Sequence, residues 1–162
     1  MNKIYIVAIL IIALGGVYYY GTTKSEIEYR QVKETVILDN LVSKVNELKG
    51  GLMSELKACE SNGLKESDGL ITFDPHPTNK KVQKASIGLY QFKVSTVQFY
   101  YKELYGKDIT GLEAVKIALS EEKSSELASD IVFKKQALNN WYNCTKAHGL
   151  QGKLDIINLL LK

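Results

Sequence analysis

Residues 4 to 20 form an unbroken apolar run, IYIVAILIIALGGVYYY, which contains no charged side chain and follows Lys3. As a helix this run is about 25 Å long, near the lower limit for crossing the hydrocarbon core of a bilayer. Lys3 and the free amino group favour a cytoplasmic N-terminus, so the rest of the chain is expected outside the cytoplasm. The tyrosine triplet at the end of the run fits the aromatic belt of a membrane interface.

Two other interpretations of this run compete with a membrane anchor. The small residues of ALGG are typical of a signal-peptide cleavage region. A buried core helix is disfavoured, because the run is terminal and has no polar face. We therefore expect residues 1–22 to be a single-pass membrane anchor or a signal peptide and 23–48 to be a helical connector. Residues 49–162 would form one extracytoplasmic domain, secreted if the first segment is cleaved.

The charge pattern is that of an ordinary globular domain. The 162 residues carry a net charge of +3, and all but one of the 21 basic residues are lysines. Surfaces that bind nucleic acid usually gather basic residues on one face and use arginine for paired contacts, so no nucleic-acid partner is expected. His76 and His148 lie far apart in the sequence and form no zinc pattern, and we expect neither a metal nor another cofactor.

Cys59 and Cys144 are the only cysteines. In an exported chain an even number of cysteines permits a disulfide, which would stabilise the fold by restricting the unfolded chain. Two buried free thiols are the alternative.

An amphipathic helix is predicted before residue 60, because apolar residues recur at helical spacing at Leu41, Val45, Leu48 and Leu52. We expect Gly50–Gly51 to break or bend it. Its second piece, about 52–60, would present Leu52, Leu56 and Cys59 on one side. Residues 61–85 then contain many turn-forming residues and both prolines, and LITF is their one clear strand-like run. This segment predicts a small hairpin or an irregular β excursion.

Helical signals resume after residue 85. The residues spaced to face the core are Leu89, Phe92, Val97 and Tyr100. Thr110 followed by Glu113 is a capping box, and a further helical segment begins at Ser124 or Ser125 and ends at Gly149. The amphipathic KLDIINLLLK closes the chain. The fold class expected is mainly α with one small hairpin.

The stretch LKACESNGLKESDG, residues 56–69, places Glu60 at the end of a predicted helix. A helix C-terminus carries partial negative charge, so the pKa of a carboxyl group there is raised. A carboxyl group that is protonated near neutral pH is what glycoside cleavage requires of its acid. A solvated glutamate that happens to end a helix is the alternative, and position alone favours it.

Two short sequence motifs, which follow one another along the chain, favour the catalytic interpretation of Glu60 instead. Glu60-Ser61 ends the helix, and SIGLYQFKVST follows the turn-rich segment. They resemble the lysozyme-like lytic transglycosylases, where Glu-Ser ends a helix and Gly-Leu-x-Gln-[Ile/Phe]-x-x-x-Thr starts the next. The matched positions of the second motif are Gly88, Leu89, Gln91, Phe92 and Thr96. The resemblance covers about residues 50–145. It implies a lysozyme-like α+β catalytic domain over 49–162 that acts on peptidoglycan glycan strands.

The resemblance implies roles for individual residues. Glu60 would be the single catalytic acid/base. Gln91 and the Tyr90 backbone would line the glycan cleft, with Ser86 near the acid. Gly88 would let the backbone approach a sugar closely, because it has no Cβ atom. The Gln91 amide suits N-acetyl and hydroxyl groups.

The sequence departs from the family in two places. The signature Ala-Tyr-Asn-Ala-Gly is absent, and LNNWYNC stands in its place. There Trp141 or Tyr142 would supply a stacking face for a sugar, unless Trp141 belongs to the core. The segment between Glu60 and Gly88 is also long and basic. A disulfide between the two cysteines would fasten the catalytic helix to the LNNWYNC segment.

The expected reaction is cleavage of the β-1,4 bond between N-acetylmuramic acid and N-acetylglucosamine, with Glu60 alone giving 1,6-anhydro products. A lysozyme-type muramidase would need a second carboxylate across the cleft, and Asp68 and Asp74 are its candidates. Both also have structural explanations, because one lies in a turn sequence and the other precedes a proline. A non-catalytic wall-binding protein is the alternative from another functional class.

Overall fold

The computed structural model describes the backbone of residues 3–62, 71–74 and 84–162. Side chains are described within these ranges from residue 23 onward, except those of Phe73, Asp74 and Lys84. The chain divides into two compact units, Met1–Lys44 and Val45–Lys162. The predicted boundary between connector and domain, at residues 48 and 49, lies close to this division.

The first unit is helical from Lys3 and belongs to α1, which spans Lys3–Glu60. The apolar run of residues 4–20 has a helical backbone, and its side chains lie outside the described part. Among the residues whose side chains are described, no helix is both long and apolar enough for a membrane span.

The last part of α1 contributes to the core of the second unit. Val45, Leu52 and Leu56 are buried, and Leu48 packs against them. Leu41, the first residue of the predicted apolar stripe, is 38% exposed and belongs to the first unit. The predicted break at Gly50–Gly51 is wrong, because α1 continues through both glycines. A helix-interior glycine costs only about 1 kcal/mol, which burial of a leucine side chain such as Leu52 offsets.

The predicted hairpin is confirmed. Strand β1, Ile71–Asp74, pairs antiparallel with β2, Lys84–Ile87, in a register that sets Thr72 opposite Ser86. A bridge between Ile87 and Phe92 then closes a tight turn over residues 88–91. The GLYQF motif is therefore a turn, and α2, Val94–Tyr105, begins after it.

The next helices have well-defined ends. Helix α3, Gly111–Leu119, begins with the predicted capping box of Thr110 and Glu113, and α4 spans Glu121–Lys135. The predicted start of α4 at Ser124 or Ser125 is wrong, because Ser120 is its N-cap. Ser124 is buried in the first turn instead and donates to the Glu121 carbonyl. Helices α2, α3 and α4 pack against one another.

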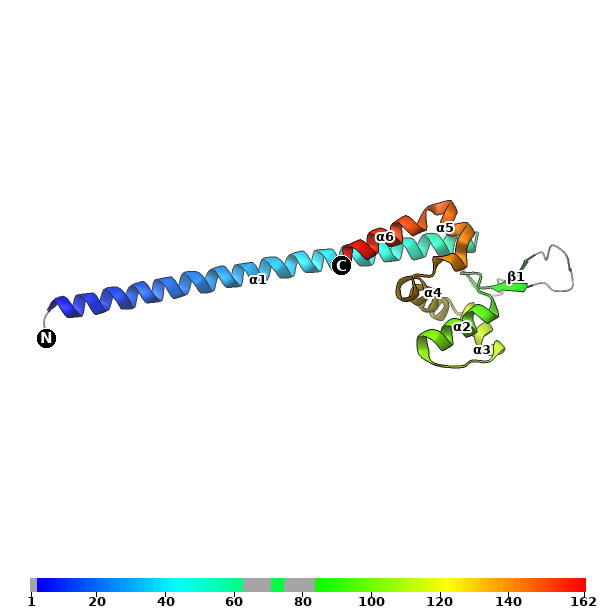
Figure 1. Ribbon diagram of the computed structural model, residues 1–162, viewed down its shortest axis with the longest axis horizontal. Coiled ribbons are helices and arrows are strands. Elements are labelled where there is room, and N and C mark those ends of the chain that lie inside the picture. The colour runs from blue at the N-terminus through cyan, green and yellow to red at the C-terminus, as the bar shows by residue number, and fades with distance from the viewer. Residues whose placement is uncertain (1–2, 63–70, 75–83) are drawn as a thin grey trace. The chain divides into compact units, whose positions relative to one another are not determined.

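The segment predicted as one helix up to Gly149 is divided. Helix α4 stops where Gln136 adopts a left-handed conformation, with φ of 56°. A short 3-10 helix, η1, then spans Leu138–Trp141, and α5 spans Tyr142–His148. Gly149 ends α5 as predicted, and α6, Leu150–Leu160, follows. Figure 1 shows α6 alongside the end of α1, where Lys153 pairs with Glu55.

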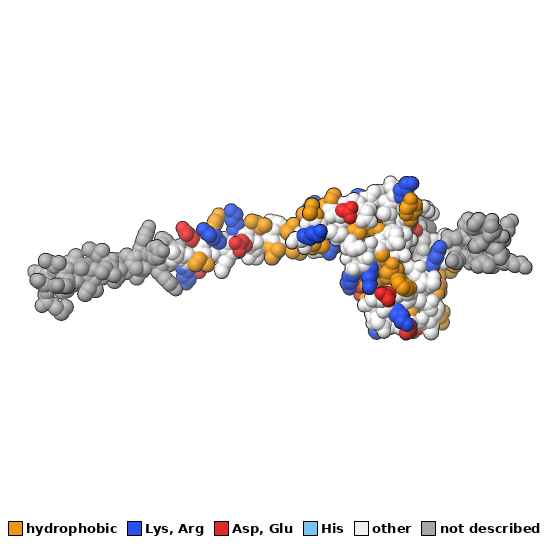
Figure 2. Space-filling view, in the orientation of Figure 1, with side chains coloured by type: hydrophobic (Ala, Val, Ile, Leu, Met, Phe, Trp, Pro, Cys, Tyr) orange, Lys and Arg blue, Asp and Glu red, His pale blue; other side chains and the backbone are white. Residues whose placement is uncertain are grey.

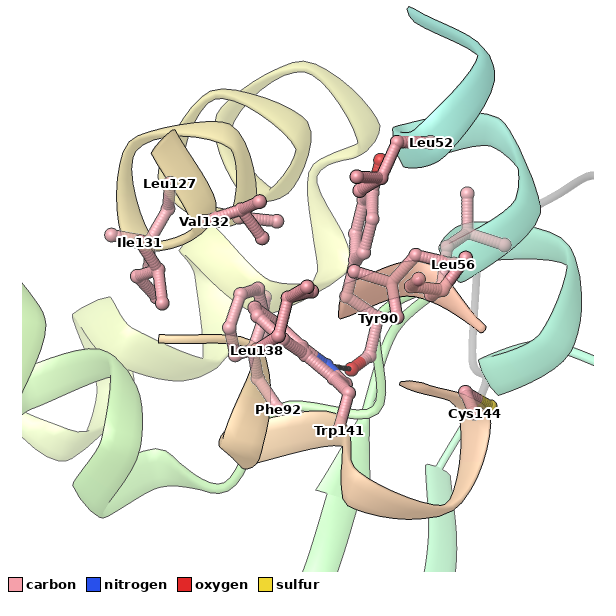
Figure 3. Packing of buried hydrophobic residues seen from close by; sticks show 14 of the residues in the cluster. Leu52, Leu56, Tyr90, Phe92, Leu127, Ile131, Val132, Leu138, Trp141 and Cys144 are labelled. Atoms are coloured by element: carbon pink, nitrogen blue, oxygen red, sulfur yellow. Dashed lines mark hydrogen bonds between the residues drawn. The ribbon is translucent and has the colours of Figure 1, made fainter. Parts of the chain in front are cut away.

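The core joins the end of α1 to α4 and to the GLYQF turn (Figure 3). Phe92 is fully buried in this core and meets the Trp141 ring edge-on, with the ring centroids 5.6 Å apart. The largest fully buried side chains of this core include Leu52, Leu56, Leu89, Phe92, Leu127, Ile131 and Leu138. The predicted core positions Leu89, Phe92 and Val97 are buried, and Tyr100 is partly buried against them.

Candidate functional site

A cleft of about 490 Å³ opens at the end of α1. Its walls come from three places in the sequence: the end of α1, the hairpin with the turn after it, and the η1–α5 segment. The lining residues are Glu60, Ser61, Asn62, Thr72, Ser86, Gln91, Lys93, Asn139, Asn140, Trp141, Tyr142 and Asn143. The cleft therefore brings Glu60 together with Ser86, Gln91 and Tyr142, all of which were predicted site residues.

Glu60 is the last residue of α1 and is half-buried in the cleft wall. The helix ends immediately after it. Ser61 is buried and its N–H donates to the Lys57 carbonyl, while Asn62 takes a left-handed conformation with φ of 52°. Asparagine tolerates this conformation better than most residues. The turn leaves Glu60 at the negative end of the helix, with its side chain at the cleft.

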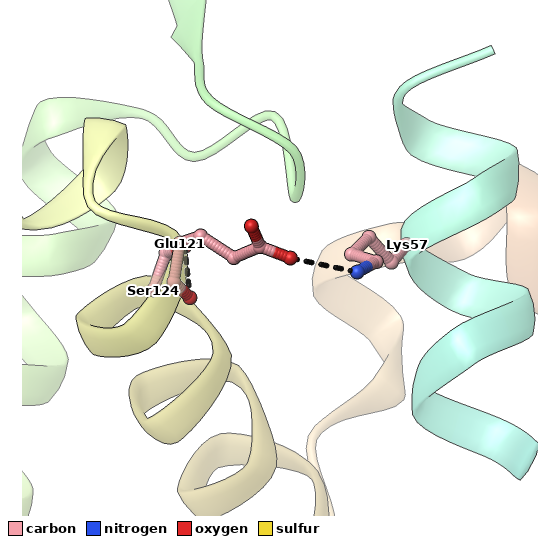
Figure 4. A network of polar contacts seen from close by, with 3 residues as sticks. All are labelled: Lys57, Glu121 and Ser124. Atoms are coloured by element: carbon pink, nitrogen blue, oxygen red, sulfur yellow. Dashed lines mark hydrogen bonds and ion pairs between the residues drawn. The ribbon is translucent and has the colours of Figure 1, made fainter. Parts of the chain in front are cut away.

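Several contacts fix the last turns of α1. The disulfide joins Cys59, next to Glu60, to Cys144 on α5, and the two Cα atoms lie 5.9 Å apart. Lys57 pairs at 3.0 Å with Glu121 in the first turn of α4 (Figure 4). Glu55 pairs with Lys153 of α6. Each exposed ion pair adds little stability, but together with the buried leucines they restrict how Glu60 can move.

The hairpin and the turn form a second wall. Thr72 and Ser86 are cross-strand partners, and both line the cleft. The Thr72 hydroxyl donates to the Gln91 amide oxygen, and Gln91 Nε2 donates to the Gly88 carbonyl at 2.8 Å. Gln91 has a φ of 49°, a left-handed conformation that is uncommon for glutamine and is typical of functional turns. The amide is thus held in place with one N–H and one lone pair not used by these bonds.

Gly88 and Tyr90 do not line the cleft, and each has a structural role instead. Gly88 has a φ of 74°, and a Cβ atom on it would overlap the Ala118 carbonyl. The close approach that glycine permits is therefore to α3, which differs from the predicted approach to a sugar. The Tyr90 carbonyl accepts a hydrogen bond of 2.8 Å from Trp141 Nε1. Burial raises the pKa of the Tyr90 phenol, and a hydrogen bond with Ser125 opposes the shift.

The two aromatic candidates have different environments. Trp141 is 4% exposed and belongs to the core, although it is also among the residues that line the cleft. Tyr142 is 64% exposed and follows it directly, at the start of α5. Tyr142 is thus the residue with an open ring face.

Seven lining residues were not among the predicted site residues: Ser61, Asn62, Thr72, Lys93, Asn139, Asn140 and Asn143. The motif LNNWYNC contains three of them, so the density of asparagine beside Trp-Tyr was the available signal. Asn140 donates to both the Tyr100 hydroxyl and the Ala137 carbonyl, which fixes its amide. Asn62 and Lys93 carried no comparable signal, because their place in the cleft depends on how the chain folds.

Among the described side chains that line the cleft, Glu60 is the only carboxylate. Asp68 lies outside the described residues. The backbone of Asp74 ends β1 opposite Lys84, and the Asp74 side chain lies outside the described part. No cluster of three or more His, Cys, Asp or Glu residues suited to a metal ion occurs in the part of the chain that was described.

A second hollow of about 220 Å³ adjoins the cleft. It shares Gln91, Lys93, Asn140 and Trp141 with the cleft, and Thr96 and Phe92 complete its lining. The two hollows are therefore neighbours. Amide, hydroxyl and aromatic side chains dominate the lining of both, and these groups bind uncharged polar molecules by hydrogen bonding and stacking.

On the face of the second unit shown in Figure 2, basic and acidic side chains of the described residues are interspersed. Comparisons with known protein families, curated proteins and solved structures find no match to this chain.

Proposed function

We propose that this chain is a peptidoglycan lytic transglycosylase with a lysozyme-like domain and with Glu60 as its acid/base. The observation that carries this proposal is the position of Glu60 in the wall of a 490 Å³ cleft lined mostly by amides, hydroxyls and aromatic rings. Gln91 of the family-like turn lies in the same cleft. A glycan fits these walls because its hydroxyl and N-acetyl groups need donors and acceptors of this kind.

In this mechanism a protonated Glu60 gives its proton to the leaving glycosidic oxygen. The substrate's own N-acetyl group stabilises the positive charge on the sugar. Glu60, now a carboxylate, removes the proton of the C6 hydroxyl, which closes the 1,6-anhydro ring. The Gln91 amide, held by Thr72 and Gly88, is positioned to bind a substrate polar group. One carboxylate is sufficient for this route.

The proposed location is outside the cytoplasm, with residues 4–20 as membrane anchor or signal peptide. The disulfide supports this location, because disulfides persist in oxidising compartments. The partners would be peptidoglycan strands and, through the N-terminal helix, the membrane.

Replacement of Glu60 tests the proposal. Glu60→Gln should abolish release of soluble fragments from purified peptidoglycan while leaving the melting temperature nearly unchanged. Glu34→Gln is the matched control, because Glu34 lies on the same helix, is exposed and is not among the cleft residues. It should digest the wall at the parent's rate. Digestion by Glu60→Gln at that rate would reject the enzymatic assignment.

Product masses distinguish the possible activities. Anhydro products lack the mass of one water relative to reducing-end sugars, and this loss is expected for every cleavage. Reducing ends throughout would indicate a muramidase, and Asp68→Asn and Asp74→Asn would then identify its second carboxylate. Binding of the glycan without any cleavage by the unmodified chain would indicate a wall-binding protein.

A further inference from the structure

Asn140 lines both the 490 Å³ cleft and the 220 Å³ hollow, and its contacts fix the orientation of its amide. Its Nδ2 group donates to the Ala137 carbonyl at 3.0 Å and to the Tyr100 hydroxyl at 2.8 Å. A carbonyl oxygen only accepts hydrogen bonds, so the contact with Ala137 settles which end of the amide is the nitrogen. Both N–H groups of Asn140 then have acceptors within the chain. The side-chain oxygen makes no hydrogen bond to another described residue, so it is the polar atom that remains for a ligand.

Gln91 lines the same two hollows and offers the complementary group. Its amide oxygen accepts from the Thr72 hydroxyl, and one N–H of its Nε2 group donates to the Gly88 carbonyl. The second N–H is left to donate to a ligand. The hollows are therefore bordered by a fixed acceptor on Asn140 and a fixed donor on Gln91.

One buried hydrogen bond links the two segments that carry these amides. Trp141 Nε1 donates to the Tyr90 carbonyl at 2.8 Å, and both residues are buried. Asn140 immediately precedes the donor residue, and Gln91 immediately follows the acceptor residue. The two amides are thus held at neighbouring positions. Trp141 also lines the 220 Å³ hollow together with Phe92, so the hollow has an apolar surface beside the amides.

A secondary amide supplies both partners that these groups require, because its N–H donates on one side and its carbonyl oxygen accepts on the other. We propose that Asn140 is a specificity-determining residue, whose oxygen accepts a hydrogen bond from the N–H of a glycan acetamido group at the 220 Å³ hollow. The free N–H of Gln91 donates to the carbonyl oxygen of that group, and the methyl group contacts the aromatic surface. Tyr100 is a positioning residue, which acts through its hydrogen bond with Asn140. This inference rests on the proposed function and concerns which group on the strand the enzyme recognises.

The effect of Asn140 should be moderate, because its side chain is exposed and water competes for its oxygen. A hydrogen bond of this kind changes an affinity about three- to tenfold. An ester in place of the acetamido group loses the N–H and sets an oxygen against the Asn140 oxygen, while it keeps the carbonyl and the methyl group. Comparison of the amide with the ester therefore isolates the contact with Asn140.

Isothermal titration calorimetry can measure binding of two tetrasaccharides. The full chain would carry Glu60→Gln, so that both ligands stay intact, and this chain is the parent of the variants below. The amide ligand alternates N-acetylglucosamine and N-acetylmuramic acid, and in the ester ligand an oxygen atom replaces every acetamido N–H. The parent should bind the amide ligand about three- to tenfold more tightly than the ester ligand. Asn140→Ala should weaken binding of the amide ligand and so reduce this preference to near one.

Tyr100→Phe tests the positioning role, because it keeps the ring and removes the hydroxyl that accepts from Asn140. It should reduce the preference to a value between those of the parent and Asn140→Ala. Tyr101→Phe is its matched control, because Tyr101 is the next residue of α2 and is among the lining residues of neither hollow. Asn139→Ala is the matched control for Asn140→Ala, because Asn139 lines the cleft but not the 220 Å³ hollow. Both controls should keep the parent's preference, and circular dichroism melts establish that each variant is folded.

The inference would be overturned if the parent bound the two ligands equally or bound neither. It would also be overturned if Asn140→Ala weakened binding of both ligands by the same factor, or of neither. Loss of the preference in Asn139→Ala would contradict the 220 Å³ hollow as the place of the acetamido group, and an unchanged preference in Tyr100→Phe would contradict the positioning role. None of these results rejects the proposed function, which digestion of peptidoglycan by the unmodified chain and by Glu60→Gln tests separately.

Discussion

Gly88 and Ala118 lie so close together that a Cβ atom on Gly88 would overlap the carbonyl oxygen of Ala118. This contact joins the GLYQF turn to the last part of α3, and Gln91 of the cleft belongs to that turn. The position of Gln91 therefore depends on a contact made on the side of the turn that does not face the cleft.

Gly88→Ala should destabilise the fold by about 3 kcal/mol or more, because a left-handed alanine costs about 1–2 kcal/mol and the overlap adds a packing cost. Gly106→Ala is the matched control. Gly106 also has a positive φ, 67°, but a Cβ atom there meets nothing within 4 Å. Gly106→Ala should lower the free energy of unfolding only by the conformational cost of a left-handed alanine, about 1–2 kcal/mol. Urea unfolding measures both, and equal losses would contradict the importance of the Ala118 contact.

The disulfide between Cys59 and Cys144 joins residues 85 positions apart. In the chain-entropy model, a cross-link over so long a loop stabilises the fold by about 4–5 kcal/mol. A variant with both Cys59→Ser and Cys144→Ser should lose about this much in urea unfolding. It should also lose activity, because the last turn of α1 is then less restrained at Glu60. For the unmodified chain, alkylation of two thiols without reductant would show that the bond is absent.

The capping box at α3 predicts a pH dependence of stability. Glu113 accepts hydrogen bonds from the Thr110 N–H at 2.7 Å and from the Thr110 hydroxyl at 2.8 Å. The backbone bond first, and then the hydroxyl bond, lower the pKa of Glu113 below its usual 4.5. A lowered folded-state pKa stabilises the fold above the unfolded pKa, and this contribution is lost as pH falls through the folded value.

Glu113→Gln should therefore melt at a lower temperature than the parent at pH 7, and the difference should shrink as pH falls below about 4.5. Glutamine also serves at this capping-box position, so the comparison isolates the charge. Thermal melts between pH 7 and pH 3 measure the difference. A constant difference over this range would show that the charge of Glu113 does not contribute.

Features that depend on neighbouring residues in the sequence were predicted well. The capping box of Thr110 and Glu113 and the stop at Gly149 are local patterns with local causes. The hairpin follows from LITF and its turn-forming flanks. The pairing of the cysteines was also predicted, although this rested on their number and on the expected export of the chain.

Features that depend on distant contacts were not predictable in the same way. The break after α4 accompanies the hydrogen bond from Trp141 to the Tyr90 carbonyl, which links segments far apart in the sequence. The continuation of α1 through Gly50–Gly51 follows from burial on both sides, at Val45 and Leu52. In each case packing outweighs local propensity. The same holds for the cleft, where Glu60, Gln91 and Tyr142 were predicted while most of the amides around them were not.

Tyr142 is expected to bind a sugar through its exposed ring. It lines the cleft and is 64% exposed, and an aromatic face of this kind contributes about 1 kcal/mol to stacking. Tyr142→Ala should therefore raise KM for solubilised glycan strands about fivefold with little change in kcat, which is the pattern of lost ground-state binding. Tyr142→Phe should retain the parent's KM. Leu112→Ala removes another exposed apolar side chain that is not among the cleft residues, and it should change neither constant. A fall in kcat at constant KM in Tyr142→Ala would instead show that Tyr142 contacts the substrate mainly in the transition state. Unchanged kcat and KM would show that Tyr142 does not contribute to substrate binding.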